Sequence, residues 1–100
     1  EEKMSKYKGY GEILRIVRIS RDMKKNQVAK NKKIATSYLS ELEQGKKSIS
    51  TKKLAELLKI YNITSVELTE LYEYHKELEN LDKTKRYQLT LLKALEMYVK

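Results

Sequence analysis

Hydroxyls, carboxylates and lysines gather in the segment 36–47. Residues 37–45 read SYLSELEQG, in which Leu39 and Leu42 are spaced i and i+3 as the apolar stripe of a short helix. Short or hydrogen-bonding side chains lie towards its other side, namely Thr36, Ser37, Ser40 and Glu41. The major groove of B-form DNA admits one helix, and its base edges present donors, acceptors and methyl groups to such side chains. We therefore expect this face to read base edges.

Basic side chains are concentrated on both sides of this helix. Nine of the 15 Lys and Arg residues in positions 1–53 lie within the segments 24–33 and 46–53. Positions 1–53 hold those 15 against six acidic residues, a net charge of +9, whereas positions 54–100 hold 7 against 8, a net charge of −1, so the first half carries all of the excess positive charge behind the chain's total of +8. Lysines beside a reading helix contact phosphates and fix its register. This distribution favours a polyanion partner, either nucleic acid or an anionic membrane surface.

Length and composition limit the remaining classes of protein. A chain of 100 residues without cysteine or proline predicts one compact domain with neither a disulfide framework nor the usual structural zinc site. Its apolar runs are far shorter than the roughly 20 residues of a membrane span, so we expect a cytoplasmic protein without membrane contact. His75 is the only histidine, and we expect it on a helix surface or in a dimer seam. Nucleophile elbows and phosphate-binding glycine loops are missing from the sequence, which predicts a non-enzyme that uses no metal or other cofactor.

Apolar residues at helical spacing predict an all-α chain. One helix should run from Tyr10 to about Asp22 and a short second one from about Lys25 to Asn31. The chain then turns over 32–35 into the helix 36–44, which Gly45 should end in a left-handed conformation.

Capping signals predict three further helices. Ser50 is a plausible N-cap for a helix with Leu54, Leu57, Leu58 and Tyr61 along one stripe. Thr64 followed by Glu67 has the pattern of a capping box, and Asp82 could cap a last helix.

This succession resembles the Cro/C1-type helix-turn-helix family, which includes phage repressors and regulators of the xenobiotic-response-element type. The resemblance covers residues 10–71. It rests on the order and spacing of GEIL at 11–14 with Arg18, Val28-Ala29, Ile34, SYLSELEQG at 37–45, and Ser48-Ile49-Ser50. It implies a lambda-repressor-like five-helix DNA-binding domain, here with an additional C-terminal helix.

The resemblance also implies roles for single residues. The family's second helix rests its N-terminus on the DNA backbone, which falls here on Lys24, Lys25 and Asn26. Base reading falls on Thr36, Ser37 and Glu41, and Ser40 would add a backbone contact. Lys46 and Lys47 match a second backbone clamp after the reading helix.

Arg18 and Glu43 match a buried ion pair that links the first and third helices of the family. Removal of one partner from such a pair leaves a buried charge and costs roughly 3–5 kcal/mol. The alternative is that Arg18 contacts a phosphate, in which case its loss would affect DNA binding alone.

The turn departs from the family pattern. Lys32 and Lys33 stand where relatives carry an aliphatic residue and then glycine, and Ala35 replaces the usual serine or threonine cap. A lysine in a left-handed conformation costs roughly 1–2 kcal/mol, so either the turn has another shape or Asn31 takes the unusual angles.

We divide the chain into a flexible basic tail (1–9), a DNA-binding domain (10–71) and a C-terminal helical extension (72–100). The extension carries apolar residues for which we expect a role in dimerisation: Leu91, Leu92, Leu95, Tyr98 and Val99. The alternative is that they pack back onto the domain. A homodimer would present two reading helices to a near-palindromic operator in double-stranded DNA.

The sequence therefore predicts a transcriptional regulator, and a repressor rather than an activator. Two alternatives are an antitoxin-like protein-interaction module and the DNA-binding fragment of a larger peptide-sensing regulator. A third is a binder of polyanions or membrane surfaces without sequence preference. The operator, the regulated genes and any small-molecule or peptide effector do not follow from the sequence.

Overall fold

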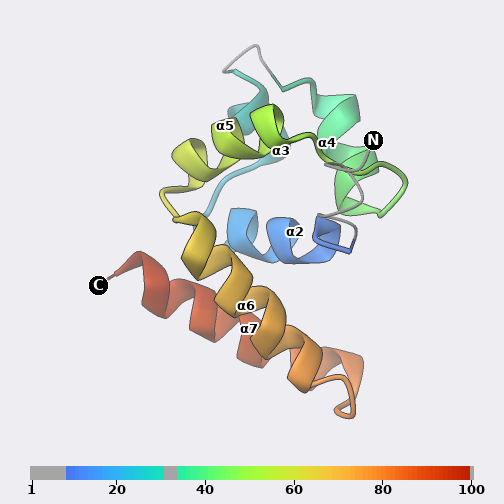
Figure 1. Ribbon diagram of the computed structural model, residues 1–100, viewed down its shortest axis with the longest axis vertical. Coiled ribbons are helices and arrows are strands. Elements are labelled where there is room, and N and C mark those ends of the chain that lie inside the picture. Colours follow the sequence, from blue (N-terminus) through green and yellow to red (C-terminus); the bar gives the residue numbers. More distant parts are fainter. Residues whose placement is uncertain (1–8, 31–33, 100) are drawn as a thin grey trace.

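The computed structural model describes residues 9–30 and 34–99, and within these ranges it contains six helices and no strand. The helices are α2 (Gly11–Ser20), α3 (Lys25–Ala29), α4 (Thr36–Glu43), α5 (Thr51–Tyr61), α6 (Ser65–Glu77) and α7 (Lys83–Tyr98). Figure 1 shows α6 and α7 side by side in the lower half, with α2 above them and α3, α4 and α5 above α2. The predicted all-α class is confirmed for this part of the chain.

Two of the predictions fall on positions that the structure does not describe. Most of the predicted tail, residues 1–8, lies outside the described residues. So do residues 31–33, which include the two lysines that depart from the family's turn.

Local capping places the starts of the three later helices as predicted. The Ser50 side chain accepts a hydrogen bond from the backbone N–H of Lys53 at 3.3 Å, ahead of α5. Thr64 and Glu67 form both bonds of the capping box at 3.0 Å, and the Asp82 carboxylate caps α7. These short-range bonds satisfy N–H groups that have no partner inside a helix.

Gly45 ends α4 as predicted, with φ +80°. Its N–H donates to the carbonyl of Leu42 at 3.1 Å, and the N–H of Lys46 donates to the carbonyl of Glu41 at 2.8 Å. This is the paired bonding of a Schellman motif, which favours glycine at the left-handed position. It fixes the path of the chain just after α4, where Lys46 and Lys47 lie.

A single apolar core sits around α2, which packs against α4, α6 and α7. Ile13, Leu14, Ile16 and Val17 of α2 are all at most 1% exposed. Gly11 begins α2 where it meets α4, and a Cβ there would clash with the carbonyl oxygen of Leu42. The close approach therefore needs glycine at this position for a steric reason that sequence analysis did not identify.

The C-terminal helix α7 packs onto α2 and α6 through one of its faces. Thr90 and Ala94 on this face are fully buried, and Leu91 is half-buried against the core. The opposite stripe stays exposed, with Leu92 at 55%, Leu95 at 37% and Val99 at 75%. Packing of α7 back onto the domain thus buries one face of this helix and leaves the opposite face exposed to solvent.

Two buried polar side chains tie α7 to the rest of the fold. The guanidinium of Arg21 donates to the carbonyls of Tyr61 at 2.7 Å and Ala94 at 2.8 Å, so it joins α5 to α7. His75 is 5% exposed, and its Nδ1 lies 2.7 Å from the hydroxyl of Thr90. The expected helix-surface position for His75 is wrong, because α7 covers this side of α6.

Candidate nucleic-acid interface

The N-terminus of α4 presents the predicted base-reading hydroxyls to solvent. The helix begins at Thr36 after Ala35, whose backbone is extended (φ −75°, ψ 148°) and supplies no side-chain cap. Thr36 and Ser37 are exposed, whereas Leu39 and Leu42 are buried in the core. The apolar stripe therefore orients α4 so that its hydroxyl side faces outward.

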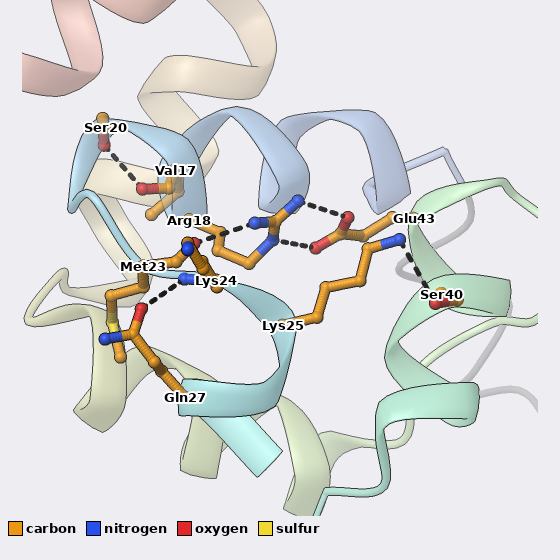
Figure 2. A network of polar contacts seen from close by, with 9 residues as sticks. All are labelled: Val17, Arg18, Ser20, Met23, Lys24, Lys25, Gln27, Ser40 and Glu43. Carbon is orange, nitrogen blue, oxygen red and sulfur yellow. Dashed lines mark hydrogen bonds and ion pairs between the residues drawn. The ribbon is translucent and has the colours of Figure 1, made fainter. Parts of the chain in front are cut away.

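The start of α3 brings basic side chains beside α4. The ammonium of Lys25 lies 3.2 Å from the hydroxyl of Ser40, which Figure 2 shows between the two helices. Lys24 and Asn26 are exposed next to it, and the first turn of α3 holds no acidic residue. The positive end of the α3 dipole and the two lysines together make this corner attractive to phosphate.

Beyond the C-terminal end of α4, two adjacent lysines lie in different surroundings. Lys46 is exposed, whereas the ammonium of Lys47 lies 3.2 Å from Oε1 of Glu41. The predicted base reader Glu41 and the predicted backbone clamp Lys47 thus form an ion pair with each other. The Glu41 side chain is 46% exposed, so it is still accessible to a ligand.

Tyr38 contacts two lysines from the outer side of α4. Its ring centroid lies 5.7 Å from the ammonium of Lys47 and 5.3 Å from that of Lys53. Burial raises the pKa of the Tyr38 hydroxyl, against the opposite effects of the Lys47 charge and a backbone hydrogen bond from Ser50. Such cation–π contacts contribute about 0.5–1 kcal/mol at exposed sites. They hold both cations near α4.

Lys53 is not among the site residues predicted from the sequence. In the sequence it belongs only to the basic segment 46–53, because its contact with Tyr38 depends on where the start of α5 lies relative to α4. Its signal in the sequence is its place in the first turn of the helix that Ser50 caps, close behind the reading helix.

Arg18 and Glu43 form a two-bond ion pair between α2 and α4. Nε of Arg18 donates to Oε2 of Glu43 at 2.8 Å, and Nη2 donates to Oε1 at 3.1 Å (Figure 2). A third bond runs from Nη1 to the carbonyl of Met23 at 2.8 Å. The hydrogen bonds to Glu43 raise the pKa of Arg18, against the effect of burial. With side chains only 11% and 2% exposed, the pair lies inside the fold rather than at the outer face of α4.

The structure brings the predicted DNA-contacting residues together around α4 and leaves the predicted dimerisation residues elsewhere. Leu92, Leu95, Tyr98 and Val99 belong to α7 or follow it directly, on the other side of α2 from α4 in Figure 1. The side chain of Tyr98 also packs over Arg21, whose Cζ lies 4.6 Å from the ring centroid.

Other kinds of site have little support in the described part of the chain. Residues 9–30 and 34–99 hold no group of three potential metal ligands among His, Cys, Asp and Glu. Among the same residues, every helix is too short or too polar to cross a membrane.

Comparison with known proteins places this arrangement in a family. A helix-turn-helix family model matches residues 14–68, from the middle of α2 into the first turn of α6. Comparisons with curated proteins and with solved structures gave no significant match. The family match spans more than half of the chain and contains both α3 and α4. The protein therefore belongs to the Cro/C1-type helix-turn-helix family and is a DNA-binding regulator.

Proposed function

We propose that this regulator binds a near-palindromic operator as a homodimer and acts as a repressor. Each protomer inserts α4 into the major groove, where Thr36, Ser37 and Glu41 meet base edges. Phosphates on one side contact Lys24, Lys25, Asn26 and Ser40, and phosphates on the other side contact Lys46 and Lys47. We infer repression because a domain bound over a promoter blocks polymerase by occupying the DNA.

The observation that carries this proposal is the outward face of α4 between two basic flanks. Thr36 and Ser37 are exposed, Lys25 reaches Ser40 from the α3 side, and the Schellman turn at Gly45 sets the lysines of the other flank just beyond the helix. Small hydroxyls can serve several bases, whereas a carboxylate suits the amino group of cytosine. The same face lies within the residues that the family model matches.

Dimerisation is proposed from the exposed stripe of α7. Leu92, Leu95 and Val99 are spaced i, i+3 and i+7 and so lie along one side of the helix. A two-fold axis through this stripe would pair residues 72–100 of two protomers while residues 10–71 of each protomer bind DNA. Two reading helices in such a dimer meet half-sites about one helical turn, roughly 34 Å, apart.

Selection from a random duplex pool at about 150 mM salt tests the operator proposal. We expect an enriched motif with two-fold symmetry and half-sites about 10 base pairs apart. Binding without enrichment that disappears as salt rises would contradict sequence-specific recognition and favour a polyanion binder.

Sedimentation of variants tests the dimer. We expect the double substitution Leu92→Glu with Leu95→Glu to convert the dimer to a monomer, because paired carboxylates cannot be buried without partners. Leu81→Glu is the matched control, since Leu81 is 38% exposed before the start of α7 and off the stripe. A dimer that persists in the double variant would contradict this interface.

Repression itself can be measured by transcription in vitro from a promoter that overlaps the selected operator. We expect less transcript as the operator fills. More transcript at full occupancy would make the protein an activator.

A further inference from the structure

Lys46 and Lys47 are adjacent in sequence but differ in their partners. The ammonium of Lys47 has two partners: it lies 3.2 Å from Oε1 of Glu41 and 5.7 Å from the ring centroid of Tyr38. Lys46 makes no ion pair or ring contact with the residues that the structure describes. Only one of the two lysines therefore has its charge neutralised before DNA arrives.

The carboxylate that neutralises Lys47 also belongs to the reading helix. Glu41 lies on α4, four residues after Ser37, so it follows the exposed hydroxyls along the same side of the helix. Lys47 engages only Oε1 of this carboxylate, and a Glu41 side chain that turns towards a base edge in the groove carries that oxygen away from the ammonium.

We propose that the Glu41–Lys47 pair couples base reading to a phosphate contact. At the correct base pair an amino group takes over the Glu41 carboxylate, and the released Lys47 binds a phosphate. At a wrong base pair the ion pair stays closed, and Lys47 adds nothing to binding. This coupling rests on the proposed function, because it requires α4 to lie in the major groove.

The physical basis is the weakness of a half-exposed ion pair. The side chains of Lys47 and Glu41 are 51% and 46% exposed, and exposed pairs of this kind contribute little to stability. A charge-assisted hydrogen bond from cytosine N4 or adenine N6 can therefore replace Lys47 as the partner of Glu41. Where the base offers no donor, opening the pair would leave a carboxylate close to phosphates, and like charges repel.

The salt dependence of binding counts phosphate contacts directly. Each contact adds about 0.9 to the slope of log K against log salt concentration on duplex DNA. We would measure this slope on the selected operator and on a shuffled duplex of the same composition. Lys47→Ala should lower the slope on the operator by about 0.9 per protomer and lower the slope on the shuffled duplex by less, because there it removes no phosphate contact and only uncovers the Glu41 carboxylate.

Lys46→Ala is the matched control for this measurement. Because Lys46 has no carboxylate partner in the described structure, its loss should lower the slope by about 0.9 per protomer on both duplexes. Equal losses on both duplexes for Lys47→Ala would overturn the coupling, since Lys47 would then be an ordinary clamp.

Glu41→Gln tests the other partner, because it removes the charge and keeps the length of the side chain. Lys47 should then bind phosphate on any sequence, so the slope on the shuffled duplex steepens by about 0.9 per protomer. The ratio of operator affinity to shuffled affinity should fall roughly tenfold. Addition of Lys47→Ala to this variant should abolish the steeper slope, and an unchanged shuffled slope in Glu41→Gln alone would overturn the proposal.

Failure of the coupling is distinguishable from failure of the proposed function. A random pool that yields no enriched sequence contradicts operator binding, and the coupling falls with it. If an operator is enriched but the effects of Glu41→Gln and Lys47→Ala on its binding are additive, only the coupling is overturned.

Discussion

Loss of Arg18 should destabilise the fold rather than weaken a DNA contact. In Arg18→Ala the Glu43 carboxylate keeps its place in the interior, 2% exposed, and loses both guanidinium bonds of 2.8 and 3.1 Å. Removal of one partner of a buried pair costs roughly 3–5 kcal/mol, out of a total stability of about 5–15 kcal/mol for a domain. For a domain of this size each kcal/mol is worth at least about 4 °C, so we expect Tm to fall by at least about 12 °C.

Thermal unfolding followed by circular dichroism measures this change, and a double variant provides the control. Arg18→Met combined with Glu43→Leu replaces both charges with apolar groups of similar volume, which is often neutral or stabilising. We expect the double variant to melt near the wild-type temperature and to bind the selected operator. An unchanged Tm in Arg18→Ala together with weaker DNA binding would refute the reasoning and assign Arg18 to a phosphate.

Three further predictions concern the interior. Burial, together with the nearby charge of Arg86, lowers the pKa of His75 below its usual 6.5. As the pH falls, the unfolded chain therefore binds a proton before the folded chain does. The contribution of His75 to the free energy of unfolding should be complete above about pH 7 and decline below about pH 6.5. Urea midpoints at several pH values test this, and His75→Asn should remove that part of the decline; an identical decline in the variant would exclude His75 as its source. Gly11→Ala should cost about 1–3 kcal/mol through overpacking where α2 meets α4, and a wild-type urea midpoint would show that the two helices can separate freely. Arg21→Lys loses the fork that reaches α5 and α7, so amide exchange in α7 should quicken; wild-type protection there would mean that core packing alone holds the helix.

Features that depend on neighbours in the sequence could be predicted before the structure. The caps at Ser50, Thr64 and Asp82 and the stop at Gly45 each involve groups a few residues apart, so their patterns are visible in the sequence. The apolar stripe through Leu39 and Leu42 likewise indicates which side of α4 faces the core.

Features that depend on how helices cross could not be read in this way. Gly11 looks like any helix-entry glycine until α4 approaches it, and Arg21 looks like a surface charge until α5 and α7 end beside it. His75 is buried because α7 folds back over α6, which the pattern of α6 alone does not reveal.

The candidate site shows the same division. Residue types and helical spacing predicted that Thr36 and Ser37 lie on the outward face of α4, since a helix fixes which side chains share a face. The pairing of Glu41 with Lys47 depends on the path after Gly45 and on side-chain conformations, so it appears only in three dimensions.

The ratio of affinities for the selected operator and for its shuffled counterpart, measured at about 150 mM salt, tests the central claim that α4 reads DNA sequence. We predict an operator Kd at least roughly 10³-fold below that of the shuffled duplex, with the advantage reduced when Thr36 and Ser37 are both replaced by alanine. A ratio near one would contradict the account, because binding would then depend on the charge of the basic flanks alone.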